Sequence, residues 1–289
     1  MSKTSAVLVL VMIFQIECQT FAEEGPSKSS PVSRVSEATK DEDGFLVHEV
    51  VSPHQAGKTL IKVLMPDKRE PDRKYPVVYV LPVEAGTESR YGSGLKEIKK
   101  LDLHNKRQAF FVAPTFSQLP WYADHPTKPE IRQETHFLKV VVPFIDKAYP
   151  ARAGKDGRLL LGFSKSGWGA YGLLLRNLEM FGKAAAWDAP MMMDKPGLYG
   201  SGDIFGTPAN FAGYQISKLL ESGAEQLRKE KRLVLFGYGN FREEHRKAHA
   251  LMDQLKIPHD YRDGPARKHD WHSGWALEAV ESLLEIPAK

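Results

Sequence analysis

Cysteine is almost absent from this sequence, since Cys18 is the only one in 289 residues. We expect even Cys18 to be lost with an N-terminal signal segment. A chain without cysteine has no disulfide, no thiolate nucleophile and no zinc site built on sulfur. Its stability must therefore come from a hydrophobic core, and its length is sufficient for one large α/β domain.

Long apolar runs and an excess of one charge are also missing. The apolar run at residues 6–14 is too short to span a bilayer. With Lys3 before it and Thr20-Phe21-Ala22 after it, the run predicts a signal peptide over residues 1–22, and hence a secreted or periplasmic protein. The net charge of +4 is not concentrated in a basic stripe, so we expect no nucleic-acid partner.

The rest of the chain divides into a short polar segment and one domain. Residues 23–44 are rich in Ser, Glu, Lys and Pro and predict a disordered leader, which leaves residues 45–289 as the domain. That domain opens with a predicted antiparallel hairpin, followed by alternating strands and helices that favour a parallel sheet with right-handed crossovers. The hairpin strands are 45–51 and 59–65; further strands are expected at 76–81, 108–113, 159–161, 183–187, 232–236 and 259–262; helices are expected near 94–101, 132–148, 215–229, 242–255 and 274–284.

One serine stands between a buried strand and a helix of small residues. Ser164 follows three consecutive leucines and has Gly162 two positions before it and Ser166 two positions after it. This is the layout of a nucleophile elbow, where small neighbours let a sharp turn project the hydroxyl above the sheet. The second glycine of the usual pattern is displaced to Gly167.

A serine hydroxyl needs a general base, and that base needs an orienting acid. His269 lies in a Gly/Pro-bearing loop after the last predicted strand and before the last helix. This is the position of the histidine in the chain order of α/β-hydrolases. We therefore predict His269 as the base.

Three stretches together resemble a known family. They are Gly162–Ala170, then Trp121-Tyr122-Ala123-Asp124 with Glu134-Thr135-His136-Phe137, and Gly264-Pro265 through His269-Asp270-Trp271. The chain is similar over roughly residues 45–285 to the esterase family that includes esterase D, feruloyl and acetyl-xylan esterases and mycolyltransferases. The resemblance implies an α/β-hydrolase fold, with a mostly parallel central sheet of about eight strands flanked by helices. It also implies Ser164 as nucleophile, His269 as base and no obligatory cofactor.

The turn in which this family carries its acid has no carboxylate here. Its sequence is Gly237-Tyr238-Gly239-Asn240-Phe241, and an amide cannot stabilise an imidazolium by charge. Asp188, at the end of the preceding strand, is our predicted acid, because a carboxylate after an apolar run is costly to bury without a partner. A structural Asp188 that caps its turn remains open, as do Asn240 or Glu243 as the orienting group.

The loop expected to hold the oxyanion is also unusual, with the sequence Leu81-Pro82-Val83-Glu84-Ala85-Gly86. The Lys165 N–H is one expected donor, and the N–H of Val83 or Glu84 is the other, since proline has none. The Glu84 carboxylate would oppose anion formation unless it turns away or pairs with Lys165 or an arginine.

Other side chains give weaker indications. Trp121, Tyr122, Trp187 and Trp271 form either an aromatic platform for a sugar or aryl group or part of the core. The histidine pairs His245/His249 and His269/His272 lack a carboxylate clearly in register, so we expect no metal site.

These patterns predict a secreted serine hydrolase that cleaves carboxylic esters of acylated carbohydrates or small acyl and aryl compounds. Its partner is then a small-molecule or polysaccharide ester, with no nucleic acid and no membrane span. One alternative is a pseudoesterase that binds a carbohydrate or a protein without turnover. A further alternative is an acyltransferase that uses the same nucleophile.

Overall fold

The computed structural model describes residues 32–285. The predicted signal peptide and the first part of the predicted leader lie outside the described residues. Among the helices of the described part, none is both long and apolar enough to cross a bilayer.

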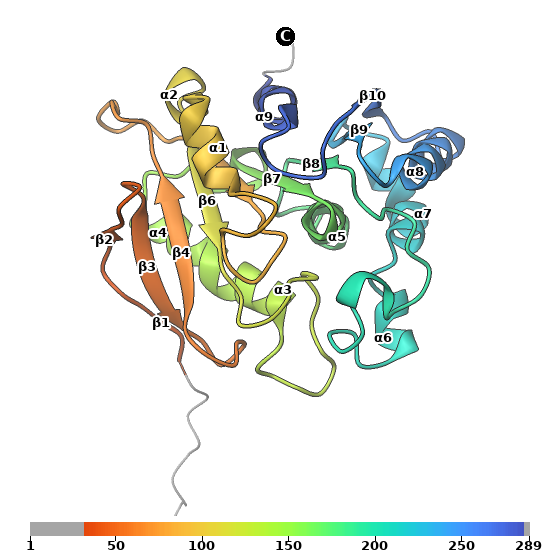
Figure 1. The fold of residues 1–289 in the computed structure, drawn as a ribbon, viewed down its shortest axis with the longest axis horizontal. Helices are drawn as coiled ribbons and strands as arrows, with labels where there is room; N and C mark the ends of the chain where they lie inside the picture. The colour runs from red at the N-terminus through yellow and green to blue at the C-terminus, as the bar shows by residue number, and fades with distance from the viewer. Residues whose placement is uncertain (1–31, 286–289) are drawn as a thin grey trace, which may run out of the picture. The chain divides into compact units, whose positions relative to one another are not determined.

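A ten-stranded sheet runs through the molecule in the order β1-β3-β4-β6-β5-β7-β8-β9-β10, with β2 paired to β3 (Figure 1). The strands from β6 to β10 pair in parallel, and β1 to β4 join the sheet antiparallel. Their bounds are β1 Arg34–Val35, β2 Thr39–Lys40, β3 Leu46–Val51, β4 Thr59–Leu64, β5 Val77–Val80, β6 Phe110–Pro114, β7 Arg158–Phe163, β8 Lys183–Trp187, β9 Leu233–Tyr238 and β10 His259–Ala266. The eight longer strands and their mixed but mainly parallel pairing agree with the predicted fold class.

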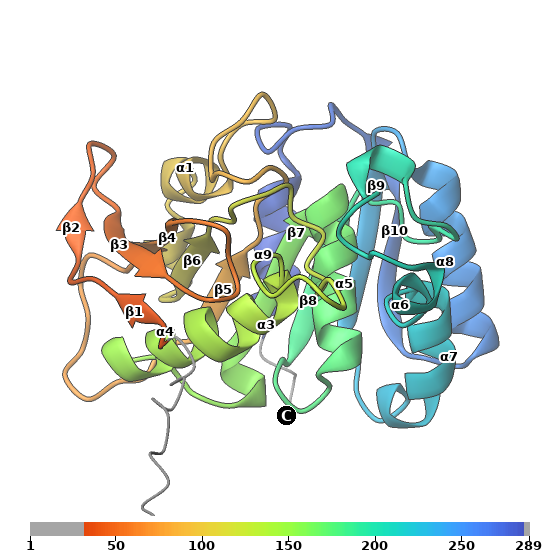
Figure 2. The same cartoon turned by 90° about the horizontal axis from the view of Figure 1, so that it is seen from below.

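Helices cover both faces of this sheet (Figure 2). On one face α1 and α9 pack together, and on the other α5 packs against β7 and β8 and beside α7. The helices are α1 Gly94–Lys100, α2 Leu103–Lys106, α3 Gln133–His136, α4 Val142–Ala148, α5 Lys165–Arg176, α6 Pro208–Ala212, α7 Ile216–Leu227, α8 Arg242–Gln254 and α9 Trp275–Leu284.

Strand β7 is buried on both faces, as its run of leucines predicts. Leu159 and Leu161 belong to the apolar cluster that α9 covers, whereas Leu160 belongs to the cluster on the opposite face. The carboxyl end of β7 therefore emerges at the centre of the sheet, where parallel α/β folds place their sites.

The predicted leader differs from the structure over residues 34–40, which form β1 and β2 against β3. The Ser36 carbonyl accepts from His48 Nδ1 at 2.8 Å, and the Ser36 hydroxyl accepts from the Glu49 N–H at 2.9 Å. These contacts with a distant strand hold a polar segment whose composition alone indicates disorder.

The helix predicted over residues 132–148 is present as one continuous helical run. A five-residue π-helical turn, Phe137–Val141, joins α3 to α4 within it. Pro143 is the second residue of α4, directly after the π-helical turn, and has no N–H to donate to that turn. The N–H of Val142 bonds to the carbonyl of Phe137, which lies five residues back in the chain and not four as in an α-helix. This is the wider turn of a π-helix.

Candidate active site

Ser164 occupies a strained turn between β7 and α5. Its φ of 53° and ψ of −133° lie where a residue with a side chain is rarely found. Backbone strain of this kind is concentrated at functional sites, and here it lifts the hydroxyl off the end of the strand. The side chain is not sealed in, since Ser164 remains 8% exposed.

The neighbours of Ser164 show why the displaced glycine is tolerated. A Cβ on Gly162 would lie 2.2 Å from the Ser166 carbonyl oxygen, so this position must be glycine. The Ser166 hydroxyl donates to the Phe163 carbonyl at 2.9 Å and accepts from the Phe163 N–H at 3.1 Å. Gly167 allows α5 to lie against Ala189, because a Cβ there would come within 2.8 Å of the alanine methyl. Through its two hydrogen bonds with Phe163, Ser166 stabilises the turn.

Asp188 lies at the end of β8, fully buried, and contacts His269. The Nδ1–H of His269 donates to Asp188 Oδ2 over 2.5 Å. Burial by itself would raise the pKa of Asp188, but hydrogen bonds from His269 and from the backbone at residues 239–241 outweigh it and hold the pKa below its ordinary value. The carboxylate is therefore charged and directed at the imidazole.

The turn after β9 surrounds this carboxylate with backbone donors. The N–H of Asn240 lies 2.8 Å from both carboxylate oxygens, and that of Phe241 lies 2.6 Å from Oδ1. A Cβ on Gly239 would come within 2.7 Å of Asp188 Oδ2, so only glycine leaves room. Asn240 thus meets the acid through its main chain and not as the orienting side chain. Glu243, the other alternative, pairs with Arg246 on the exposed face of α8 at 3.0 Å.

His269 lies beside the residue that precedes Ser164. Its ring centroid is 5.0 Å from that of Phe163 and 5.6 Å from that of Tyr91. The Ser164 N–H donates to the Trp187 carbonyl at 3.1 Å, which joins the serine backbone to the residue before Asp188. Within the described part of the chain, no hydrogen bond joins the Ser164 hydroxyl to His269. In serine hydrolases without substrate this distance is often long, and it shortens when the substrate binds.

The expected oxyanion loop lies next to the elbow. Glu84 pairs with Lys165 Nζ at 3.3 Å, one of the arrangements that the sequence required. A hydrogen bond also holds this loop in place, because the Tyr122 hydroxyl donates to the Pro82 carbonyl at 2.6 Å. The Lys165 N–H begins α5, so it has no partner within the helix and stays available, and Val83 is buried in the same loop.

The four aromatic residues do not form an open platform, which corrects that interpretation. Trp121 and Trp187 are 0% exposed, and Tyr122 and Trp271 are 2% exposed. Trp121 packs against Trp168 and Trp187 stacks on Trp275, each pair at a centroid separation of 5.5 Å. Their large apolar rings fill the core on either side of the elbow.

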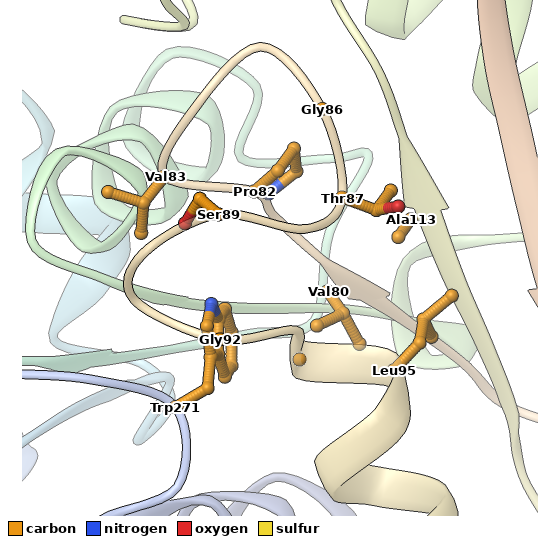
Figure 3. A pocket seen from close by; sticks show the side chains of 11 residues that line it. Val80, Pro82, Val83, Gly86, Thr87, Ser89, Gly92, Leu95, Ala113 and Trp271 are labelled. Atoms are coloured by element: carbon orange, nitrogen blue, oxygen red, sulfur yellow. The ribbon is translucent and has the colours of Figure 1, made fainter.

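A small pocket borders the oxyanion loop. Figure 3 shows Pro82 and Val83 on one side of it and Trp271 on another, with Leu95 of α1 nearby. Neither Ser164 nor His269 lines this pocket. The pocket is therefore separate from the predicted nucleophile and base.

One positioning contact in the structure had not been predicted. His245, weighed only as a metal ligand, accepts the N–H of Ala189 at its Nε2 over 2.8 Å. Burial lowers the pKa of His245 to about 4, so the ring is neutral and able to accept. It holds the backbone directly after Asp188, whose own φ is 42°. No local pattern reveals this contact, because it joins α8 to a loop more than fifty residues away.

The two histidine pairs considered for metal binding are engaged separately. His245 is bonded to Ala189, and His272 Nδ1 contacts Glu97 Oε2 at 2.8 Å. Among the described residues, a different group brings metal-ligating atoms together, namely His249, Asp253 and His259.

Comparisons with known proteins identify a family and several structures of the same fold. A family model described as "Putative esterase" matches residues 52–203. No curated protein sequence matches the chain. Among solved structures, a ferulic acid esterase is 19% identical, with 87% of this chain and 96% of that one covered and a TM-score of 0.66. An S-formylglutathione hydrolase from Staphylococcus aureus is 15% identical, covering 83% and 98%, with a TM-score of 0.66. A ferulic acid esterase from Anaeromyces mucronatus is 16% identical, covering 90% and 94%, with a TM-score of 0.56. At these identities the structures share the fold.

Proposed function

This chain belongs to the esterase family, and we propose that it hydrolyses carboxylic esters with Ser164 as the nucleophile. The observation that carries the proposal is the contact between His269 and the buried Asp188, next to the strained turn at Ser164. An α/β-hydrolase needs these three groups at three strand ends.

The contact with Asp188 determines what His269 can do. Because Nδ1 carries the hydrogen that points at the carboxylate, Nε2 has a free lone pair. In the proposed reaction Nε2 takes the proton of Ser164 as its oxygen attacks the ester carbonyl. The charged Asp188 stabilises the imidazolium so formed, which then protonates the leaving alcohol. Water repeats the sequence to release the acid.

The oxyanion formed on attack is proposed to lie between two backbone donors. The Lys165 N–H at the start of α5 is one, and the Val83 or Glu84 N–H is the other. The pairing of Glu84 with Lys165 balances the negative charge beside this position.

Two features of the sequence favour a pseudoesterase, and neither removes a group that the reaction needs. Asn240 stands where the family's acid is expected, yet a carboxylate reaches His269 from β8 instead. Glu84 is paired rather than free. Both features are therefore compatible with turnover.

The proposed substrates are acylated carbohydrates or small acyl and aryl esters, encountered outside the cytoplasm after secretion. This choice is supported by the feruloyl esterases among the structural neighbours and by the N-terminal sequence pattern.

A fluorophosphonate probe tests the proposed nucleophile. We expect covalent labelling of the wild-type protein, none in Ser164→Ala, and normal labelling in Ser222→Ala, which removes an exposed serine on α7. Absence of labelling in the wild type would favour the pseudoesterase, and labelling that persists in Ser164→Ala would place the nucleophile elsewhere. To examine acyl transfer, an aryl acetate is supplied with an excess of a sugar alcohol. The proposal expects free acetate as the main product.

A further inference from the structure

Two histidines and an aspartate lie together at the edge of the sheet, where α8 ends and the edge strand β10 begins. His249 and Asp253 are one turn apart on α8, and His259 is the first residue of β10. His249 Nδ1 lies 2.8 Å from His259 Nε2, and His249 Nε2 lies 3.4 Å from Asp253 Oδ2. None of the three belongs to the proposed catalytic group.

The tautomer of His259 is fixed by its other neighbour. His259 Nδ1 lies 2.7 Å from the Ile257 carbonyl oxygen. A carbonyl can only accept, so this nitrogen carries the hydrogen. In the neutral ring, Nε2 of His259 therefore presents a bare lone pair to His249.

A chain of three contacts runs from the Ile257 carbonyl through His259 and His249 to Asp253. Two neutral imidazoles supply only two hydrogens between them. Whichever tautomer His249 adopts, one contact is left with two lone pairs facing each other. When the hydrogen is on Nε2 of His249, the facing lone pairs are those of the 2.8 Å contact between the two rings, an arrangement that a shared metal ion satisfies.

We propose that His249 and His259 bind a divalent transition-metal ion such as Zn²⁺, which imidazole ligands suit, with Asp253 as the outer partner that orients His249. His249 then carries its hydrogen on Nε2, facing Asp253, so that Nδ1 of His249 and Nε2 of His259 both hold the ion. Bonds of 2.0–2.1 Å to a tetrahedral ion place two nitrogens about 3.3 Å apart. The two rings therefore need to separate by about half an ångström from their 2.8 Å contact and to turn so that both lone pairs face the ion.

The surroundings of the two rings match those of metal-ligating histidines. In the proposed tautomers each ring directs its outer N–H toward an oxygen, that of Ile257 for His259 and that of Asp253 for His249. Such an outer contact orients a ligand and increases its basicity. The His259 side chain is only 4% exposed, and Tyr261 stacks on His249 at a centroid separation of 4.0 Å. Asp253 is 62% exposed, which leaves a side open for the ion to enter.

Occupancy would join the end of α8 to the start of β10. Since an ion that binds only the folded protein stabilises it by mass action, Zn²⁺ is expected to raise the melting temperature. This role is independent of ester hydrolysis.

Titration of the metal-free full-length protein with Zn²⁺ tests the site, by calorimetry and by thermal unfolding. We expect saturable binding of one ion at this cluster and a rise in Tm. His249→Gln and His259→Gln should each weaken Zn²⁺ binding by at least about tenfold, because even orienting contacts are worth that much. Asp253→Asn should weaken it as well, and the matched control His54→Gln should bind as the wild type does.

Because His249 and Asp253 are less buried than His259, their variants are expected to fold even if His259→Gln does not. If His259→Gln fails to fold, as circular dichroism would reveal, His249→Gln and Asp253→Asn still decide the outcome. Affinity that is equal in His249→Gln, Asp253→Asn and the wild type would overturn the proposal. So would a wild-type protein that binds no Zn²⁺.

Discussion

Replacing Asp188 by Asn should abolish most of the activity, because the amide cannot satisfy the groups that the carboxylate contacts. One carboxylate oxygen accepts from Asn240 and Phe241, and the other accepts from Asn240 and His269. An amide has a single oxygen. If that oxygen faces the backbone donors, the NH₂ group faces His269 and forces its hydrogen from Nδ1 to Nε2, where the ring can no longer take the serine proton.

The size of the effect follows from that tautomer. In serine proteases the same exchange costs about four orders of magnitude in kcat, equivalent to about 5.4 kcal/mol of transition-state stabilisation. We expect a similar loss here, measured as kcat on an aryl acetate, with KM little changed. Folding should be checked by urea unfolding, because the opposite amide orientation would set NH₂ against two backbone donors.

Two control variants test whether the loss is specific to Asp188. Asn240→Ala keeps the backbone N–H that reaches Asp188, and Glu243→Gln alters a side chain that pairs with Arg246. Both should retain kcat within about tenfold, or 1.4 kcal/mol. A loss of less than tenfold in Asp188→Asn, or an equal loss in Glu243→Gln, would refute the assignment of the acid.

Three further changes test other parts of the structure. Gly162→Ala should destabilise by about 1–3 kcal/mol in urea unfolding, because its Cβ meets a carbonyl oxygen at 2.2 Å, whereas Gly172→Ala in α5 has its nearest atom at 4.0 Å and should be neutral or stabilising; equal effects would contradict the packing argument. Since the folded-state pKa of His245 is about 4 against an ordinary 6.5, the unfolded state binds more protons between these values. The free energy of unfolding should therefore fall, by up to about 3 kcal/mol, as the pH drops from 6.5 to 4, and a flat profile across that window would show that the ring is not held neutral. Lys165→Ala should lower kcat by leaving the Glu84 charge unpaired beside the oxyanion, and adding Glu84→Gln should restore part of it; no recovery in the double variant would count against this pairing.

The order and type of the main elements followed from the sequence because hydrophobic patterns are local. Strand β8 begins and ends at the residues that the apolar run indicates, and the hairpin of β3 and β4 has the expected antiparallel pairing. Patterns of this kind record which faces are buried. They do not record which distant segment does the burying, and so β1 and β2, held by contacts with β3, were predicted as a leader.

Some residues of the candidate site could also be predicted from local sequence patterns, and others could not. Ser164 could be located because an elbow imposes small residues at fixed spacings, and His269 because of the order of elements along the chain. Asp188 could be named only as one of several carboxylates, since its contact with His269 spans 81 residues. The contact of His245 with Ala189, and the meeting of His249 with His259, depend on how α8 packs beside the sheet, which no spacing in the sequence records.

The turn after β9 has a consequence for how this protein could vary. Its main-chain N–H groups donate to the carboxylate of Asp188, which follows the adjacent strand β8. The negative charge and the groups that stabilise it therefore belong to different segments of the chain. Substitutions at Asn240 are thereby expected to leave the proposed catalysis unchanged, as long as the main chain of this turn keeps its conformation. Glycine at 239, with no chemistry of its own, becomes the less replaceable residue of the two.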